Sequence, residues 1–308
     1  MKYLNIGNQI KASEISLGMM RIPGKSLKEI AELVDTALGC GINFFDHADI
    51  YGGGKCEELF ADAVGMNASV RGKYIIQTKC GIRPGFFDFS KEHILSSVDA
   101  SLKRLKTDYI DVLLLHRPDT LMEPEEVASA FEILKANGKV RHFGMSNQKP
   151  LQIELLQKYL TGVGIDIIIN QLQFSVTNTG MIDSGLNVNM QNAGSVNHDG
   201  DVLEYCRLKD ITIQTWSPFM YGFFAGVYLG NNEKYAALNE TIDKYAKKYG
   251  VTNSAMAIAW ILRHPAGMQP IVGSTDKTRV AEICKASGVS LTREEWYDIY
   301  KSAGNILP

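Results

Sequence analysis

Eight short apolar segments, each followed by a helical pattern, constrain the fold of this chain more than any other feature. Short, fully apolar strands separated by amphipathic helices are typical of a parallel sheet that helices cover on its outer face. Eight such units in a chain of 308 residues predict an α/β fold, a (β/α)8 TIM barrel. The predicted strands are residues 15–17, 42–45, 74–78, 110–115, 140–144, 167–169, 211–215 and 270–272.

An open, doubly wound sheet is the alternative, but no G-x-G-x-x-G motif follows any early strand, and the barrel is therefore favoured. Residues 3–12 alternate around Gly7-Asn8, which predicts an N-terminal β-hairpin. From about Leu291 onward, the spacing of Trp296, Ile299 and Tyr300 predicts a C-terminal tail helix. We interpret residues 1–308 as one barrel domain.

Composition excludes several classes of partner. A net charge of −2 argues against nucleic acid or an anionic membrane, and no run approaches the ~18 apolar residues of a membrane span. Five widely spaced cysteines without a C-x-x-C motif, and an N-terminus without a secretion signal, predict reduced thiols and a cytoplasmic protein. The expected partner is a small molecule, and no feature points to a particular oligomeric state.

Polar side chains stand where the apolar segments end. Asp46, Lys79 and His116 each follow a predicted strand directly, and Tyr51 comes five residues after Asp46. Because the strands of a barrel are parallel, we expect all four side chains to meet at one face. Such a site would combine a carboxylate, an amine, an imidazole and a phenol, which are side chains typical of an active site.

The chemistry of these groups suggests a role for each. A free tyrosine has a pKa of about 10, and we expect a cationic Lys79, held in place by Asp46, to lower it. Tyr51 would then be a general acid toward a carbonyl oxygen, to which His116 donates a hydrogen bond. The alternative is a structural ion pair with packed aromatic side chains, which is less favoured because buried ion pairs are poor stabilisers.

Four stretches, 44–52, 111–119, 138–147 and 216–218, resemble the aldo-keto reductase superfamily, and most closely its bacterial oxidoreductase branch. The resemblance extends over essentially the whole chain. The family's Asp, Tyr, Lys and His tetrad falls on Asp46, Tyr51, Lys79 and His116. The resemblance implies that the protein reduces an aldehyde or ketone to an alcohol by direct hydride transfer from NADPH.

The resemblance also implies a cofactor site. Ser146, Asn147 and Gln171 would hold the carboxamide, Trp216 would stack on the nicotinamide, Ser217 to Phe219 would line the pyrophosphate, and Asp46 would be a further cofactor contact. Gly273, Ser274, Lys277 and Arg279 would bind the 2′-phosphate, with Met20 and Arg21 as further contacts. Gly273 replaces a lysine of the better-known pattern, and Ile283 replaces an adenine-binding asparagine, so NADH is a possible second cofactor.

Two long loops, 81–89 and 175–199, follow the third and sixth strands and are candidate lids or substrate-pocket walls. Phe86 and Phe87 would either cover the barrel rim or line that pocket. Two other functions remain open: a cofactor-binding regulatory subunit with little turnover, and a barrel enzyme of different chemistry. No motif indicates which carbonyl compound is the natural substrate.

Overall fold

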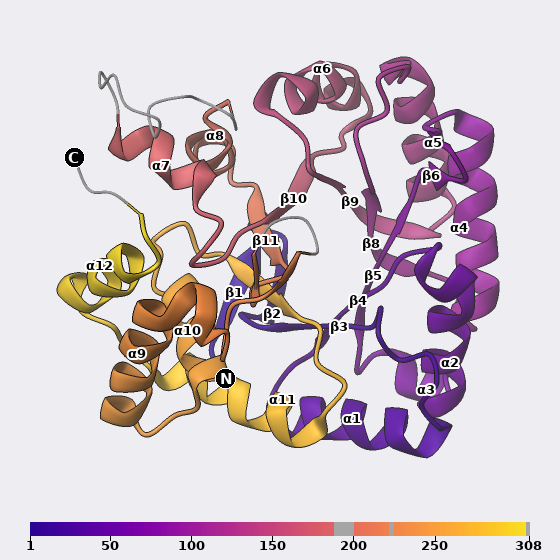
Figure 1. Cartoon of the computed structure of the whole chain (residues 1–308). Coiled ribbons are helices and arrows are strands. Elements are labelled where there is room, and N and C mark those ends of the chain that lie inside the picture. Colours follow the sequence, from indigo (N-terminus) through magenta and orange to yellow (C-terminus); the bar gives the residue numbers. More distant parts are fainter. Residues whose placement is uncertain (188–199, 222–224, 306–308) are drawn as a thin grey trace.

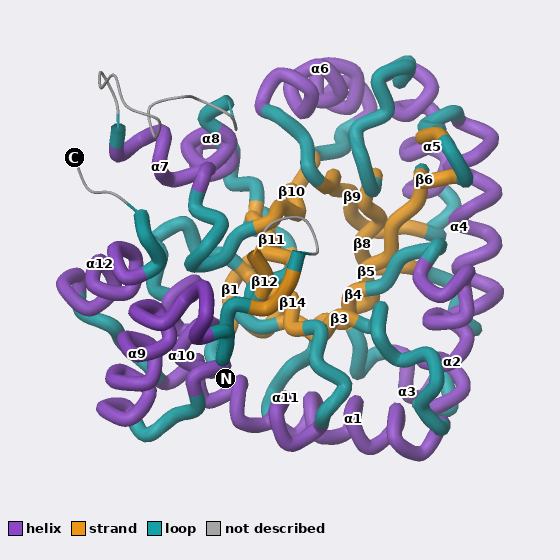
Figure 2. The backbone as a smooth tube through the Cα atoms, in the orientation of Figure 1, coloured by secondary structure: helices purple, strands orange, loops and turns teal. Residues whose placement is uncertain are grey.

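The computed structural model describes residues 1–187, 200–221 and 225–305. Within these ranges, eight parallel strands form a closed barrel, in which each strand pairs with the next and the last pairs with the first (Figure 1, Figure 2). The predicted (β/α)8 barrel is confirmed. Its strands are β3 (Ser16–Gly18), β4 (Phe44–Asp46), β5 (Ile75–Cys80), β8 (Ile110–Leu115), β9 (Val140–Ser146), β10 (Ile167–Gln173), β11 (Thr212–Trp216) and β14 (Gln269–Val272).

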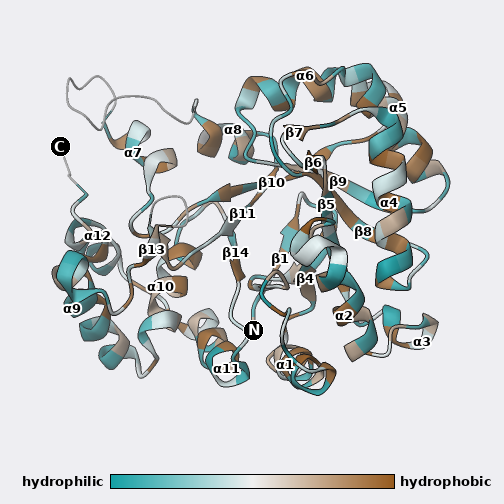
Figure 3. Ribbon diagram, turned by 45° about the vertical axis from the view of Figure 1, so that its right-hand side comes forward, coloured by the Kyte–Doolittle hydropathy of each residue, from teal (hydrophilic) through white to brown (hydrophobic). Residues whose placement is uncertain are grey.

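Helices surround the barrel and turn their apolar faces toward it. In α1, Ser26 and Glu29 form a capping box, and Ile30, Leu33 and Val34 are buried. Figure 3 shows the resulting mixture of hydrophobic and hydrophilic residues along these helices. They are α1 (Leu27–Gly39), α2 (Lys55–Ala63), α3 (Ala68–Arg71), α4 (Lys91–Leu105), α5 (Pro124–Ala136), α6 (Pro150–Leu160), α7 (Gly180–Leu186), α8 (Val202–Leu208), α9 (Asn232–Tyr249), α10 (Asn253–Leu262) and α11 (Lys277–Cys284).

The predicted hairpin closes one end of the barrel. Strands β1 (Tyr3–Ile6) and β2 (Ile10–Ser13) pair antiparallel, and they bury Ile6 and Ala12 against barrel residues such as Phe44 and Ile168. Gly7 has a φ of +51°, and an added Cβ would lie 2.4 Å from the Cβ of Ile168, so only glycine fits this turn. Within the described residues, the hairpin therefore leaves the opposite end of the barrel for a small molecule.

The predicted tail helix is α12 (Arg293–Ser302). Its Trp296 ring stacks on Trp260 of α10 at 4.7 Å and on Tyr300 at 5.7 Å. Each of the two tryptophans donates its indole N–H to the other's backbone carbonyl, at 3.0 and 2.9 Å. This reciprocal pair fixes the tail against the barrel. No helix in the described ranges is long and apolar enough to cross a membrane.

The two long loops contain short elements of their own. Residues 81–89 form an antiparallel ribbon of β6 (Ile82–Arg83) and β7 (Phe86–Phe87), in which Phe86 and Phe87 are exposed. The second loop begins with a turn bridged between Ser175 and Asn178 and continues into α7, whereas 188–199 lie outside the described residues. A second ribbon, β12 (Met220–Tyr221) with β13 (Gly226–Val227), follows β11.

Candidate active site

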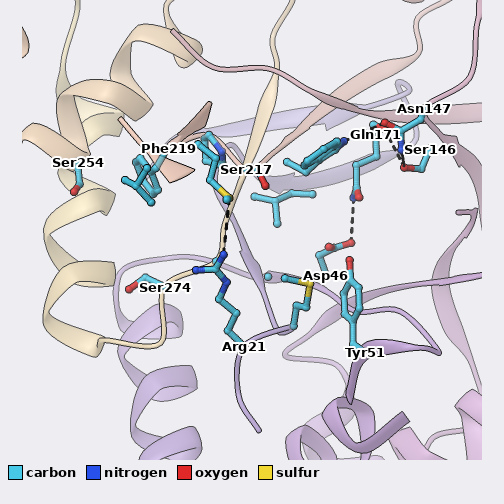
Figure 4. A pocket seen from close by; sticks show the side chains of 18 of the residues that line it. Arg21, Asp46, Tyr51, Ser146, Asn147, Gln171, Ser217, Phe219, Ser254 and Ser274 are labelled. Atoms are coloured by element: carbon cyan, nitrogen blue, oxygen red, sulfur yellow. Dashed lines mark hydrogen bonds between the residues drawn. The ribbon is translucent and has the colours of Figure 1, made fainter. Parts of the chain in front are cut away.

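A cavity of about 580 Å³ opens at the carboxyl ends of the barrel strands (Figure 4). Its volume suits a small-molecule or cofactor site. Of the sequence-predicted site residues, all but Lys79 and Lys277 line it. These are Met20, Arg21, Asp46, Tyr51, His116, Ser146, Asn147, Gln171, Trp216, Ser217, Phe219, Gly273, Ser274 and Arg279.

Lys79 lies directly beneath the cavity and joins two of the predicted catalytic residues. It is fully buried in β5, and its Nζ donates to Asp46 Oδ2 at 2.8 Å and to Tyr51 Oη at 3.1 Å. The Nζ also donates to the backbone oxygen of His47 at 2.7 Å. All three ammonium protons therefore have acceptors, and the Tyr51 hydroxyl is fixed at the cavity floor.

A network of buried glutamines holds Asp46 from the other side. Its Oδ1 accepts from the amides of Gln77 at 2.6 Å and Gln171 at 3.2 Å. Both of these amides also donate to Gln214 Oε1, and Gln214 in turn donates to Gln269. The network spans the barrel interior and gives the carboxylate a single orientation. No sequence motif pointed to it.

Lys79 lowers the pKa of Tyr51, as expected, but the net shift of that pKa is upward. Burial of the phenol raises its pKa above 10, and Lys79 opposes this rise only in part. Burial also lowers the pKa of Lys79, but Asp46 and Tyr51 outweigh it and raise that pKa. At neutral pH the site therefore holds a protonated phenol beside a cationic lysine, which is the state that a general acid needs.

His116 lies beside Tyr51 at the cavity wall, with a distance of 5.9 Å between the ring centroids. Burial, together with Lys79 and Arg117, lowers its pKa well below 6.5. The imidazole is therefore neutral at pH 7 and carries one N–H donor. Its Nδ1 has no hydrogen-bond partner among the described residues, so one ring nitrogen is buried without compensation.

A row of amides and one indole forms the wall opposite Tyr51. Asn147 Nδ2 donates to Ser146 Oγ at 2.8 Å, and Trp216 Nε1 donates to Asn147 Oδ1 at 3.2 Å. Asn147 and Ser217 have φ values of +60° and +51°, which non-glycine residues rarely adopt. Such strain is concentrated at functional sites. The side-chain amide of Asn147 and the ring of Trp216 lie at the cavity surface.

The far end of the cavity is cationic. Ser274 and Arg279 line it, and Arg21 extends toward Met220, whose sulfur lies 3.9 Å from Arg21 Nη2 (Figure 4). Lys277 does not reach the cavity because its ammonium pairs with Glu32 of α1. The structure thus brings two of the three predicted phosphate-binding side chains together and leaves Lys277 outside.

Several lining residues were not predicted from the sequence. The most notable is Arg117, whose guanidinium carbon lies 5.6 Å from the centroid of the Trp216 ring. It directly follows His116, so its place in the chain was a usable signal. The others, which are mostly apolar or come from later loops, had none; they are Gly18, Ile50, Met220, Val227, Leu229, Gly230, Asn253, Ser254 and Ile271. Pro218 and Ile82 also line the cavity, and both lie in stretches that the sequence had placed near the site.

The thiols and carboxylates around the barrel do not suggest a metal site. All five cysteines are free, as expected. Burial raises the pKa of the Cys80 thiol, next to Lys79, well above 9, so it is an unreactive thiol at neutral pH. In the described ranges, no three His, Cys, Asp or Glu side chains are grouped so that they could hold a metal ion.

The loop that carries Tyr51 contains a second unusual carboxylate, Asp49. Its Oδ1 is buried without a hydrogen-bond partner among the described residues. Burial, and then repulsion from Glu57, raise the pKa of Asp49 from 3.8 to about 7. Glu57 itself accepts hydrogen bonds from Thr78 Oγ1 at 2.6 Å and from Arg104 Nε at 2.7 Å.

We expect the Asp49 carboxyl to make stability depend on pH. The folded protein retains a proton that the unfolded chain has already lost, so the free energy of unfolding should fall as pH rises from about 4 to about 7. The full difference is about 4 kcal/mol, at about 1.4 kcal/mol per pKa unit. Urea unfolding at pH 4 and pH 8 measures it.

The Asp49→Asn variant removes this titration and should be the more stable protein at pH 8. Asp108→Asn, at an exposed position, serves as the control and should keep the wild-type pH dependence. An unchanged pH dependence in Asp49→Asn would show that the carboxyl ionises as it does in the unfolded chain.

Comparison with known proteins shows the family of the chain. The model of the aldo/keto reductase family matches residues 14–303. An uncharacterized oxidoreductase of Bacillus subtilis, YcsN, is 34% identical over 97% of each chain, and a 6-dehydroglucose reductase of Agrobacterium fabrum is 32% identical over 98% of each. A probable voltage-gated potassium channel subunit beta of Oryza sativa is 27% identical over 94% of this chain and 92% of its own. The chain belongs to the aldo/keto reductase family of oxidoreductases.

Proposed function

We propose that the chain works as one (β/α)8 domain that reduces an aldehyde or ketone to an alcohol with NADPH. The observation that carries the proposal is the position of Lys79, whose Nζ contacts both Asp46 and Tyr51 beneath the cavity. A lysine shared by a carboxylate and a phenol is poorly explained by packing, because a buried ion pair adds little stability. It is well explained by proton donation.

In this proposal Tyr51 donates its proton to the substrate oxygen as that oxygen gains negative charge. Lys79 stabilises the phenolate that remains, and Asp46 keeps Lys79 charged and oriented. Neutral His116 donates a hydrogen bond to the same oxygen and so positions the carbonyl. The apolar side chains of Ile50 and Ile82 also line the cavity.

The cavity fits a nicotinamide dinucleotide, the cofactor class of this family, which supplies the hydride when bound. The two ends of the cavity differ in a way that suits the two ends of such a cofactor. Amides and an indole line one end, and a serine and two arginines line the other. We propose that Ser146, Asn147 and Gln171 hold the carboxamide and that Trp216 stacks on the nicotinamide. Ser217 and Phe219 would flank the pyrophosphate, with Ser274 and Arg279 at the 2′-phosphate.

The direct test is NADPH consumption, followed at neutral pH, over a panel of chemically diverse aldehydes and ketones. The proposal expects oxidation that depends on both the protein and a carbonyl compound. Tight NADPH binding without oxidation across the panel would instead favour a regulatory subunit, the function that the name of the rice relative indicates for that protein. Absence of both binding and oxidation would overturn both proposals.

The 2′-phosphate assignment predicts a selective effect of Arg279→Ala. The variant should bind NADPH about 10- to 100-fold more weakly, as expected for loss of a hydrogen bond to a charged group, and NADH nearly as well as before. Fluorescence titration with both cofactors measures the two affinities. Lys277→Ala, which removes a cation outside the cavity, is the matched control and should weaken neither. Equal weakening of both cofactors in Arg279→Ala would refute the assignment.

A further inference from the structure

The ribbon of β6 and β7 leaves the barrel beside the proposed catalytic residues. Strand β5, which carries Lys79, ends at Cys80, and the ribbon begins two residues later at Ile82. The backbone oxygen of Cys80 accepts the backbone N–H of His116 at 2.9 Å, and Ile82 and His116 both line the cavity. In the barrel, β3 and β4 separate β5 from β14, the strand that precedes Ser274 (Figure 2). The ribbon therefore stands at the end of the cavity proposed for the carbonyl, away from the end proposed for the 2′-phosphate.

The two phenylalanines of the ribbon lie on opposite faces of it. Ile82 pairs with Phe87, and Arg83 pairs with Phe86. Residues that pair directly in an antiparallel ribbon share a face, and consecutive residues alternate between the two faces. The guanidinium carbon of Arg83 lies 5.1 Å from the Phe86 ring centroid, as expected for two side chains on one face. Because Ile82 lines the cavity, the face that Ile82 shares with Phe87 is turned toward the cavity, whereas Phe86 is turned away.

Contacts at the base of the ribbon hold the backbone of Phe87 in place. Gly81 has a φ of +106°, and an added Cβ would lie 2.3 Å from the buried ring of Phe89, so only glycine allows this close approach. The backbone N–H of Asp88 donates to the Gly81 oxygen at 2.9 Å, and the Asp88 carboxylate pairs with Arg83 at 2.7 Å. Phe87 directly precedes Asp88, so its position is set before a ligand binds, which lowers the entropic cost of binding.

The side chains at this end of the cavity leave an apolar surface for a ligand. Phe87 is 44% exposed although its face is turned toward the cavity. Ile50, which directly precedes Tyr51, lines the cavity and is 39% exposed. The backbone N–H of Asp49 donates to the Lys79 oxygen at 3.0 Å, which puts Ile50 beside the end of β5 as well. An apolar group that covers such side chains releases water from both surfaces, and an aromatic ring gains further from contact with a second ring.

We propose that Phe87 is a specificity-determining residue and that the natural substrate is an aldehyde or ketone with an aromatic or similarly bulky apolar group. This inference rests on the proposed reductase function and names the substrate class of the same site. The carbonyl oxygen is held by Tyr51 and His116, and the apolar group extends past Ile82 to the Phe87 ring at the cavity mouth. Phe87 thereby favours large apolar carbonyl compounds over small ones, which the catalytic residues alone would treat alike.

Two aldehydes of different size test the proposal, with kcat and KM measured for each and NADPH saturating. Biphenyl-4-carbaldehyde carries two aromatic rings, and acetaldehyde carries a methyl group. Phe87→Ala should lower the ratio of their kcat/KM values, biphenyl-4-carbaldehyde over acetaldehyde, about 10-fold relative to wild type, as expected for the loss of one aromatic contact. The change should appear mainly as a higher KM for the larger aldehyde. Phe87→Tyr, which keeps the ring, should retain the wild-type ratio.

Phe86→Ala is the matched control, because it removes the same side chain from the same ribbon on the face turned away from the cavity. It should leave the ratio at its wild-type value. An unchanged ratio in Phe87→Ala would overturn the proposal. An equal fall of the ratio in Phe86→Ala would overturn it too, because the effect would then come from the ribbon as a whole.

A binding measurement separates this inference from the proposed function. The protein is titrated calorimetrically, with NADP⁺ saturating, with biphenyl-4-carboxamide, a neutral compound without an aldehyde or ketone. Wild type and Phe86→Ala should bind it equally, and Phe87→Ala about 10-fold more weakly. Such binding without reduction of any carbonyl compound would support the apolar site and overturn the reductase. Reduction without a preference or binding that depends on Phe87 would overturn the apolar site alone, and absence of both would overturn both proposals.

Discussion

Replacing Tyr51 with phenylalanine should lower kcat about 100- to 10,000-fold, the range typical for loss of a general acid, while NADPH binds nearly as tightly as to the wild type. The substitution removes one oxygen, the acceptor of the 3.1 Å hydrogen bond from Lys79, and keeps the ring that fills the cavity floor. Steady-state kinetics on the best substrate of the panel and fluorescence titration with NADPH measure the two quantities separately.

Tyr3→Phe is the control for this prediction, because Tyr3 lies in the hairpin at the closed end of the barrel. It should leave both turnover and NADPH affinity unchanged. If Tyr51→Phe lost turnover and cofactor affinity by the same factor, the phenol would be a structural group, and the assignment of the proton donor would be wrong.

Replacing Lys79 with methionine should have the largest combined effect on stability and turnover. It leaves the Asp46 carboxylate buried with the amides of Gln77 and Gln171 but without its ion-pair partner. Breaking a buried pair from one side costs about 3–5 kcal/mol, so the urea midpoint should fall markedly. Turnover should fall at least as far as in Tyr51→Phe, because no cation stabilises the phenolate.

A double variant separates the two effects of Lys79. Lys79→Met combined with Asp46→Asn removes both charges and keeps an oxygen at position 46 as acceptor for Gln77. The double variant should regain most of the lost stability but none of the turnover. Recovery of both would mean that Lys79 serves only to neutralise Asp46. No recovery of either would mean that the hydrogen bonds of Lys79 to Tyr51 and to the backbone oxygen of His47 are what matters.

The fold was predictable because each barrel strand is a short apolar run between helices, and because no G-x-G-x-x-G motif pointed to the open, doubly wound alternative. The strand ends were less predictable. Lys79, Ser146 and Gln171 were expected just beyond their strands but lie within β5, β9 and β10. Each is a polar residue that points into the barrel, where hydrogen bonds replace apolar contacts. A strand end placed at the last apolar residue therefore falls before the observed end of the strand.

The placement of the four proposed catalytic side chains followed from one rule, that parallel strands end at the same face. The rule says which groups meet but not how their environment shifts a pKa, and for this reason the upward net shift in the pKa of Tyr51 was not predicted. The rule also does not show which other residues can pair with a side chain and hold it away from the site. Lys277 had a cation's charge and a suitable position in sequence, but Glu32, 245 residues away in sequence, holds it outside the cavity.

We propose that this cavity reduces a carbonyl group by hydride transfer from NADPH, with Tyr51 as proton donor. Following the transferred hydrogen tests this directly. The measurement uses NADPH deuterated at both C4 positions and the best carbonyl substrate, with mass spectrometry of the alcohol. We expect one deuterium on the former carbonyl carbon for each NADPH oxidised. We also expect the Tyr51→Phe variant to form this deuterated alcohol far more slowly. Alcohol without deuterium, or the same rate in Tyr51→Phe as in the wild type, would contradict it.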